Sequence, residues 1–260
     1  MATDRTEPTT TEPTTTEPTT TETTETTTTG LSAGGATRAG TSRPAGAPTA
    51  VILDLDGTIT DSAPVITRSL AETLSANGYG HHEPETLVRF VGPPIRETFH
   101  VLTGLPEEET TPLVDDYRGR YAARMLEATV YPGIADLLTR LHAAGVPLAL
   151  ATSKVRALAR EILAGARLDR YFTVIEGASP DERISSKADV VAEALAGLRL
   201  AGADLSGVVM VGDRHHDVDG AAHHGVGTIL VRWGYGKPEE ADGARAVAAD
   251  ADELGRLLGD

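Results

Sequence analysis

The residues best able to do chemistry in this chain are Asp54 and Asp56, which follow the short apolar run of residues 50–53. An uncharged, β-prone run of this kind is typical of a strand buried on both faces of a parallel sheet. Two carboxylates at the end of such a strand are costly to bury without a partner. Because α/β sheets bind ligands at the carboxyl ends of their strands, the pair indicates a cation held between them.

Two further apolar runs also end in polar residues. Residues 146–151 are followed by Thr152, and residues 208–211 are followed by Asp213 and, four positions later, Asp217. The carboxyl ends of parallel strands meet at one edge of the sheet, so we expect these side chains to converge with the first pair of aspartates. Such a cluster predicts a ligand site assembled from distant parts of the sequence.

The order of these motifs resembles that of the haloacid dehalogenase (HAD) superfamily, from about residue 50 to the end of the chain. Asp54-Leu55-Asp56-Gly57-Thr58 resembles motif I, Thr152-Ser153-Lys154 motif II, Lys187 motif III, and Gly212-Asp213-Arg214-His215-His216-Asp217 motif IV. Counterparts in the phosphoglycolate-phosphatase branch are found for Tyr131-Pro132-Gly133, residues 172–181 and residues 232–236. The threonine-rich N-terminal segment departs from that branch.

The resemblance implies a role for each carboxylate. Asp54 would be the nucleophile that forms an aspartyl-phosphate, and Asp56 would be the general acid and then the general base. The Asp54 and Asp213 side chains, with the backbone carbonyl of Asp56, would hold Mg²⁺. Asp217 would contact the metal directly or through another residue, and these alternatives stay open.

The resemblance also implies residues that bind the phosphoryl group. Thr152 and Ser153 would donate hydrogen bonds to its oxygens, and Lys187 would neutralise the charge that develops there. Arg96 follows the Gly92-Pro93-Pro94 stretch, and we expect it to face the site and bind a carboxylate of the substrate.

Alternation of strands with helices predicts an α/β fold with a Rossmann-like, doubly wound parallel sheet. The predicted strands are residues 50–53, 146–151, 172–175, 208–211 and 228–231, and the helices between and after them are residues 134–144, 155–164, 187–198, 217–224 and 252–258. The core would comprise residues 49–62 and 131–260. Residues 63–130 would be a helical cap without strands, with helical stretches at residues 65–76, 84–90, 95–103 and 107–126.

Residues 1–48 are a low-complexity segment rich in Thr, Glu and Pro, which predicts a disordered tail.

The formal net charge of −15 argues against nucleic acid and against an anionic membrane as partners. The chain has no cysteine, no long apolar run and no signal-peptide pattern, so we expect a cytoplasmic protein. Its paired histidines lack the cysteines or the His-Glu-x-x-His pattern of a zinc site.

The resemblance to the HAD superfamily implies an Mg²⁺-dependent phosphatase that acts on a small phosphorylated metabolite, with 2-phosphoglycolate as the leading candidate. A 5'-nucleotidase, a pyrophosphatase, a phosphotyrosine phosphatase or a β-phosphoglucomutase-like phosphotransferase would carry the same motifs. A non-catalytic phosphate-binding scaffold is the alternative from another class, although it would not need the complete set of motif residues. The oligomeric state stays open.

Overall fold

The computed structural model describes residues 46–181 and 184–260, so nearly all of the expected tail lies outside the described residues. Its main sheet has six parallel strands in the order β5-β4-β1-β6-β7-β8. These strands are β1 (Ala50–Leu53), β4 (Leu148–Val155), β5 (Val174–Ala178), β6 (Val208–Gly212), β7 (Gly227–Val231) and β8 (Ala246–Ala248). The predicted doubly wound α/β sheet is thereby confirmed.

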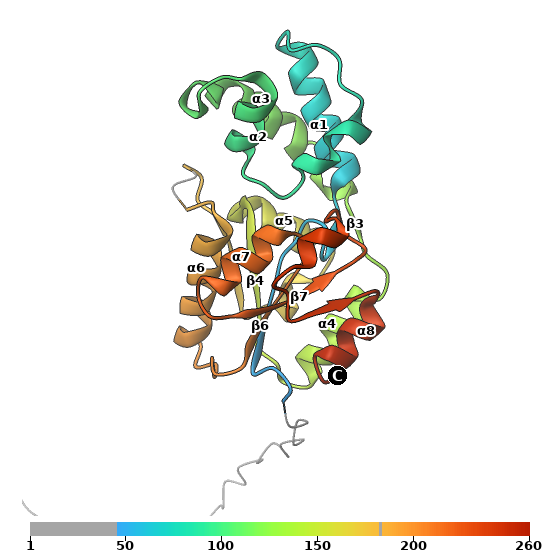
Figure 1. Cartoon of the computed structure of the whole chain (residues 1–260), viewed down its shortest axis with the longest axis vertical. Helices are drawn as coiled ribbons and strands as arrows, with labels where there is room; N and C mark the ends of the chain where they lie inside the picture. Colours follow the sequence, from blue (N-terminus) through green and yellow to red (C-terminus); the bar gives the residue numbers. More distant parts are fainter. Residues whose placement is uncertain (1–45, 182–183) are drawn as a thin grey trace, which may run out of the picture. The chain divides into compact units, whose positions relative to one another are not determined.

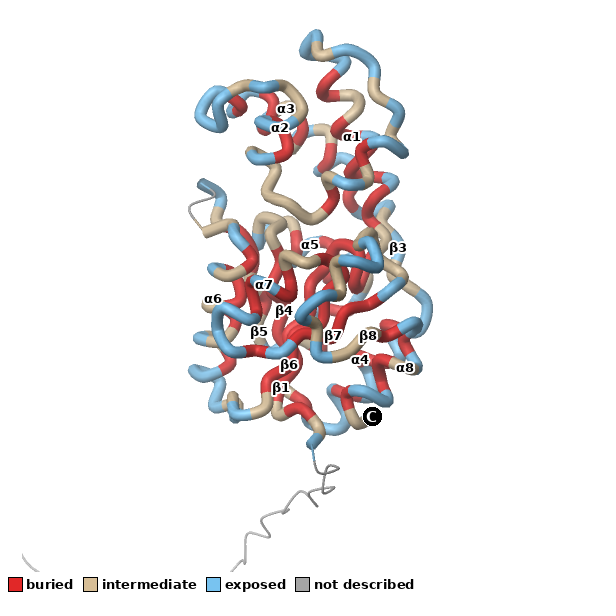
Figure 2. Tube along the Cα trace, viewed as in Figure 1, coloured by how far each residue is buried: buried red, intermediate tan, exposed pale blue. Residues whose placement is uncertain are grey.

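The central strand β1 is buried on both faces, as its uninterrupted apolar sequence predicts. Val51 and Leu53 belong to one hydrophobic cluster, whereas Ala50 and Ile52 belong to a second. This division follows from the alternation of side chains along a strand. Figure 2 shows the resulting buried centre of the molecule around β1, β4 and β6.

Helices cover each face of the sheet. One cluster includes residues of α4 (Ile134–Ala143), α5 (Arg156–Gly165) and α8 (Ala251–Leu257), and it continues into the helices of residues 63–130. The other takes them from α6 (Lys187–Leu200) and α7 (His215–Ala222). Figure 1 shows α6 beside α7, and α4 beside α8 on the other side of the sheet.

Between motif I and α4 the chain forms a mostly helical segment, residues 63–130, which we call the insertion. It contains α1 (Ala63–Ala76), η1 (Pro84–Phe90), α2 (Ile95–Thr103), η2 (Glu107–Thr110), α3 (Thr111–Ala122) and η3 (Met125–Glu127), where η denotes a 3-10 helix. The expectation that this segment has no strand is wrong at its end. There β3 (Thr129–Val130) pairs antiparallel with β2 (Thr60–Asp61), so the chain enters and leaves the insertion through one two-stranded ribbon.

Three other details differ from the predicted elements. The short edge strand β8 was not predicted, because three small residues have no pattern of their own. Val155 ends β4 rather than beginning the following helix, because β4 is bulged between Thr152 and Val155. Two further 3-10 turns, η4 (Asp169–Tyr171) and η5 (Pro238–Ala241), lie in connections.

Across residues 46–181 and 184–260, none of the helices has the length and apolar character needed to cross a membrane.

Candidate active site

Asp54 and Asp56 lie at the carboxyl end of β1, and only 5% and 7% of their surfaces are exposed. The loop that carries Asp56 folds back on itself, because Leu55 O accepts hydrogen bonds from the backbone N–H groups of both Ile59 and Thr60 at 2.9 Å. Gly57 has a φ of +82°, and a Cβ at this position would collide with the carboxylate of Asp213. The glycine of motif I is therefore required by backbone conformation and by space.

Lys187 lies at the start of α6 and reaches the end of β1. Its Nζ lies 2.9 Å from Asp54 Oδ1 and 2.8 Å from Asp217 Oδ1, and it donates a hydrogen bond to the carbonyl of Ala151 at 3.1 Å. Burial alone would lower the pKa of Lys187, but the neighbouring carboxylates of Asp217 and Asp54 raise it overall. The lysine is therefore held as a cation against the first aspartate of motif I.

A second buried lysine, Lys154, meets the other aspartate. Its Nζ lies 3.0 Å from Asp56 Oδ2 and 4.2 Å from the ring centroid of Tyr121 in α3. The ring of Tyr117 stacks on that of Tyr121 at a centroid distance of 5.7 Å. Burial alone would lower the pKa of Lys154, but the Asp56 carboxylate, together with Tyr121 and Tyr117, raises it overall. This contact depends on the bulge of β4, which redirects the residues after Thr152.

Asp54, Asp213 and Asp217 form one buried cluster, with one carboxylate oxygen of each within 4.8 Å of the others. Asp213 Oδ2 accepts a hydrogen bond from the backbone N–H of Tyr235 at 2.6 Å, whereas its Oδ1 is buried and accepts none from the described residues. Asp217 Oδ2 accepts hydrogen bonds from the backbone N–H groups of Asp213 and Arg214, both at 3.0 Å. Asp217 thus holds the loop of motif IV.

The electrostatics of this cluster fit a divalent cation. Burial is the largest influence on Asp213 and raises its pKa well above 3.8, and the carboxylates of Asp217 and Asp54 add to the effect. Burial likewise raises the pKa of Asp54 to about 6, although Lys187 acts in the opposite direction. Three carboxylates with only one lysine between them repel one another, and a hard cation that binds oxygen would relieve that repulsion.

The remaining predicted phosphoryl-binding residues also lie at this edge. Thr152 is buried at the end of the regular part of β4, and its Oγ1 accepts a hydrogen bond from the backbone N–H of Lys154 at 3.3 Å. Ser153 lines a pocket that also contains Asp56 and Lys154. The structure therefore brings all the predicted core residues together.

This pocket lies between the sheet edge and the insertion, and we call it the leaving-group pocket after the role that we propose for it. Besides Asp56, Ser153 and Lys154, it is lined by Val155, Leu158 and Ser185 from the sheet side, and by Ile66, Phe90, Gly92, Pro93, Pro94, Ile95, Tyr117, Arg118 and Tyr121 from the insertion. Most of the insertion residues are apolar or aromatic, and Arg118 is the charged one among them. The second aspartate of motif I, unlike the first, thus shares a cavity with the insertion.

Arg96 does not line this pocket, contrary to the expectation from the sequence. Its guanidinium donates a hydrogen bond to Thr111 Oγ1 at 3.0 Å, at the start of α3. Spacing along α2 could not reveal this, because the direction of the guanidinium depends on how α2 packs against α3.

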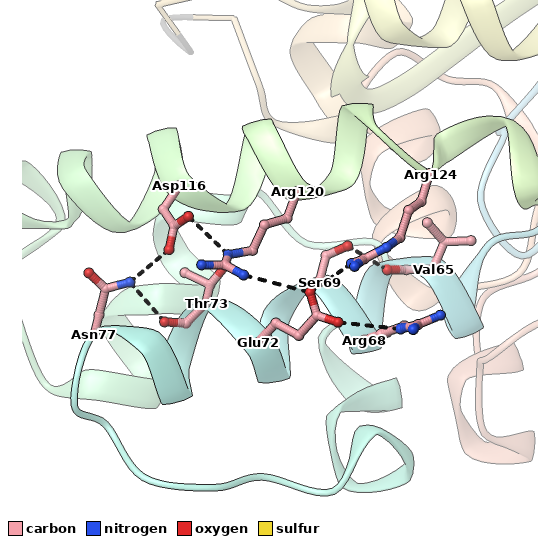
Figure 3. A network of polar contacts seen from close by, with 9 residues as sticks. All are labelled: Val65, Arg68, Ser69, Glu72, Thr73, Asn77, Asp116, Arg120 and Arg124. Carbon is pink, nitrogen blue, oxygen red and sulfur yellow. Dashed lines mark hydrogen bonds and ion pairs between the residues drawn. The ribbon is translucent and has the colours of Figure 1, made fainter.

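Three other insertion arginines contribute to packing between α1 and α3 (Figure 3). Arg68, Arg120 and Arg124 surround the carboxylate of Glu72, with nitrogen–oxygen distances of 3.3, 3.7 and 2.7 Å respectively. Arg120 also pairs with Asp116 at 2.9 Å. These arginines hold the insertion together and do not line the leaving-group pocket.

Sequence reasoning gave Lys154 and Tyr235 no role, and both contact the site. The Tyr235 hydroxyl accepts hydrogen bonds from the backbone N–H groups of Ser62 and Ala63, and it lies 2.9 Å from Asp61 Oδ1. Its backbone also contacts Asp213, so Tyr235 connects the acid cluster to the first turn of α1. The scarcity of lysine could have drawn attention to Lys154, but no local signal predicts the contacts of Tyr235.

A protein-family model described as haloacid dehalogenase-like hydrolase matches residues 51–231. Among curated relatives, the Mycobacterium tuberculosis tyrosine-protein kinase PtkA is 44% identical over 223 residues, which are 84% of this chain and 75% of PtkA. Its solved structure has a TM-score of 0.70 and covers 82% of this chain, while the match spans 99% of that structure.

Two further relatives are each 36% identical. The match to the 5'-nucleotidase of Pseudomonas aeruginosa covers 73% of this chain and 85% of that enzyme. The match to the phosphoglycolate phosphatase of Agrobacterium fabrum covers 71% of this chain and 80% of that enzyme. The resemblance drawn from the motifs is therefore confirmed over most of the described chain.

Proposed function

The chain belongs to the haloacid dehalogenase-like hydrolase family, and we propose that within it this protein is an Mg²⁺-dependent phosphatase of small phosphate monoesters, with 2-phosphoglycolate as the leading candidate substrate. The observation that carries the proposal is the pairing of each motif I aspartate with its own buried lysine, at 2.9 Å for Asp54 and 3.0 Å for Asp56. One aspartate lies beside the acid cluster, and the other lies in the leaving-group pocket.

In the proposed reaction, a carboxylate oxygen of Asp54 attacks phosphorus and the bond from phosphorus to the leaving oxygen breaks. The carboxyl group of Asp56 gives its proton to that oxygen, so an alcohol leaves and an aspartyl-phosphate remains. Asp56 then takes a proton from water as the water oxygen attacks phosphorus. This step regenerates the Asp54 carboxylate and releases inorganic phosphate.

Positive charge and hydroxyl groups would support the phosphoryl group through both steps. Lys187 would neutralise oxygens of the transferring group from its position beside Asp54, while Thr152 and Ser153 would donate hydrogen bonds. The contacts of Asp217 with Lys187 and with two backbone N–H groups favour a role in holding these partners over direct contact with a metal.

Mg²⁺ would be held by Asp54 and Asp213 together with the backbone carbonyl of Asp56. The buried Asp213 Oδ1, which accepts no hydrogen bond from the described residues, supports this assignment. When bound, the metal would offset the charge of the phosphate dianion and lower the repulsion between the carboxylates.

We further propose that residues 63–130 act as a cap that receives the leaving group, because their side chains make up most of the leaving-group pocket. In that case Arg118 is the cap arginine that binds an anionic group of the substrate. It replaces Arg96 in this role, since Arg96 is directed at Thr111.

The proposal is tested by phosphate release from a panel of esters that includes 2-phosphoglycolate, nucleoside 5'-monophosphates, pyrophosphate, phosphotyrosine and p-nitrophenyl phosphate. We expect activity that requires Mg²⁺, is lost with EDTA and returns when Mg²⁺ is restored. Arg118→Met should reduce activity on 2-phosphoglycolate far more than on p-nitrophenyl phosphate. An enzyme that is fully active in EDTA would contradict the metal assignment.

The identity to PtkA favours a second candidate function, phosphoryl transfer to a protein tyrosine. An aspartyl-phosphate can in principle be attacked by a hydroxyl group other than that of water. Incubation with radiolabelled ATP, Mg²⁺ and a tyrosine-containing peptide separates the two functions. Phosphotyrosine formed faster than inorganic phosphate would favour transfer, whereas phosphate release alone would favour hydrolysis.

A further inference from the structure

Arg214, the residue after Asp213, spans from the sheet edge to the insertion. Only 9% of its surface is exposed, and its Nη1 donates a buried hydrogen bond to the carbonyl of Val91 at 2.7 Å, 123 positions earlier in the chain. A charged donor on a buried carbonyl makes a stronger hydrogen bond than a neutral donor would. The contact therefore joins motif IV directly to a loop of the insertion.

That loop, residues 91–94, determines the shape of the leaving-group pocket. Gly92, Pro93 and Pro94 line the leaving-group pocket together with Asp56, and they also line a second pocket that includes Lys187. The loop is therefore a wall shared by two cavities. Movement of this wall would change how the leaving group of a substrate fits beside Asp56.

The loop and the arginine are matched in shape. Gly92 has a φ of +112°, a conformation that side chains rarely adopt. A Cβ at this position would lie 3.6 Å from Cγ of Arg214, so the aliphatic stem of the arginine packs alongside the loop. The hydrogen bond from the guanidinium to Val91 is thus supported by packing of the arginine's stem.

Glu240 in η5 orients the guanidinium from the other side. Its Oε2 accepts a hydrogen bond from Arg214 Nε at 2.9 Å and another from the backbone N–H of His215 at 3.0 Å. Its Oε1 accepts a hydrogen bond from the backbone N–H of Lys237 at 3.1 Å. The His215 Nδ1 also lies 2.9 Å from Glu240 Oε2. Although partial burial opposes it, the bonds from Arg214, from the side chain and backbone of His215 and from the backbone of Lys237 lower the pKa of Glu240 to about 2.

We propose that Arg214 is a positioning residue that holds the loop of residues 91–94 against the sheet edge, with Glu240 fixing the direction of its guanidinium. This inference rests on the proposed function for its kinetic consequence but not for its structural one. Arg214 touches the wall of the pocket and has no part in the proton or phosphoryl transfers. Its loss should therefore weaken the fit of the leaving group and spare the binding of free phosphate.

The structural consequence is tested without any substrate. Because the chain has no cysteine, Pro93→Cys places a single thiol on the loop. In the Pro93→Cys background, Arg214→Met should speed labelling by a thiol reagent about tenfold, as expected for the loss of a hydrogen bond from a charged donor. Arg199→Met, an exposed arginine in α6, is the matched control and should leave the labelling rate unchanged. Equal labelling rates in the two variants would overturn the proposal.

The kinetic consequence is tested with p-nitrophenyl phosphate and with inorganic phosphate as product inhibitor. Arg214→Met should raise KM about tenfold, while the inhibition constant of inorganic phosphate changes less than about twofold. Arg214→Lys keeps a donor and should recover part of the KM, and Glu240→Gln should shift it in the same direction as Arg214→Met. A KM that stays at the wild-type value, or a parallel rise in the inhibition constant of phosphate, would contradict the assigned role.

The labelling experiment also separates two kinds of failure. If the wild-type chain hydrolyses none of the esters but Arg214→Met still frees the loop, the proposed function is wrong and the positioning role stands. If Arg214→Met does not fold, labelling of Pro93→Cys in the Arg214→Lys and Glu240→Gln variants decides the matter, and unchanged rates in both would overturn the positioning role.

Discussion

The two buried lysines of the site differ in the parts of the molecule that hold them. All polar contacts of Lys187 described above come from the sheet and its flanking helices, through Asp54, Asp217 and the Ala151 carbonyl. Lys154 instead lies between Asp56 of the sheet edge and the Tyr121 ring of the insertion. The polar contacts described for Lys187 thus involve no residue of the insertion, whereas Lys154 contacts an insertion residue directly.

This difference has a consequence for how the site can change. Lys187 has its described polar contacts in the core, so it would keep its geometry if the insertion moved. The pair of Lys154 and Asp56 would instead lose its aromatic neighbour, Tyr121. We therefore expect variants on the Lys187 side to affect every substrate equally. Variants on the Lys154 side should affect substrates according to their leaving group.

The largest effect is expected from Asp54→Asn. Removal of a nucleophile lowers kcat by at least about 10⁴-fold, because no covalent intermediate can form. Phosphate release from p-nitrophenyl phosphate measures the loss, and Asp136→Asn, an exposed residue of α4, is the control. Retention of more than a few per cent of the activity would contradict the role of Asp54.

Lys187→Met should lower kcat by about 10²–10³-fold on every ester, since the lysine acts on the phosphoryl group that all of them share. It also leaves Asp54 and Asp217 buried without their cation, which should cost about 3–5 kcal/mol of unfolding free energy. Urea denaturation measures this cost, and added Mg²⁺ should restore part of the stability. A loss of activity that varies widely among esters would break the comparison between the two lysines.

Unlike Lys187→Met, the variant Lys154→Met should lower kcat by an amount that depends on the leaving group of the ester. With an alkyl phosphate, whose leaving oxygen needs a proton from Asp56, kcat should fall by about 10²-fold, because the Asp56 carboxyl group loses the partner that fixes its direction. With p-nitrophenyl phosphate, whose leaving group is stable as an anion, the loss should stay below about tenfold. The ratio of the two losses is the measurement, and a ratio near one would show that Lys154 does not act through Asp56.

Tyr121 offers a smaller and sharper test of the aromatic contact. Tyr121→Phe keeps the ring above Lys154 and should leave stability nearly unchanged. Tyr121→Leu removes the ring and should lower the unfolding free energy by about 2 kcal/mol, the size of a desolvated cation–π interaction. Combining each change with Lys154→Met in a double-mutant cycle isolates the interaction free energy between residues 121 and 154. We expect this free energy to be measurable in the cycle with Tyr121→Leu and absent in the cycle with Tyr121→Phe.

The smallest effect concerns Glu240, which helps to join the core to the insertion. Its pKa in the folded chain is about 2, below the ordinary value of 4.5, so its contribution is fully present above pH 4.5 and is lost as the pH falls toward 2. Glu240→Gln should therefore lower Tm at pH 7 by about 2–4 °C, equivalent to roughly 1 kcal/mol in a chain of this size.

The lower Tm of Glu240→Gln relative to wild type should disappear at acidic pH. The difference in Tm between wild type and Glu240→Gln should shrink as the pH falls below 4.5. Glu161→Gln, an exposed residue of α5, should show no such trend. If this difference in Tm grew at acidic pH, a titrating group other than Glu240 would control it.

Sequence reasoning predicted the fold where a local pattern reflects burial. The apolar residues of β1 predict a strand that is covered on both faces. Helix α4 is predicted by apolar residues at i, i+3, i+4 and i+7, which are Ile134, Leu137, Leu138 and Leu141. Reasoning of this kind missed β8, whose three residues are too few for a period. It placed Val155 in a helix because a bulge leaves no trace in the alternation of side chains.

The sequence by itself determined which carboxylates gather at the sheet edge, because the ends of parallel strands must meet there whatever the side chains do. Only the tertiary structure decided which lysine meets which aspartate, why Arg96 is directed away while Arg118 lines the pocket, and how Arg214 reaches Val91. Those contacts depend on the direction of long side chains and on the packing of the insertion. Neither is encoded by spacing along a single helix or strand.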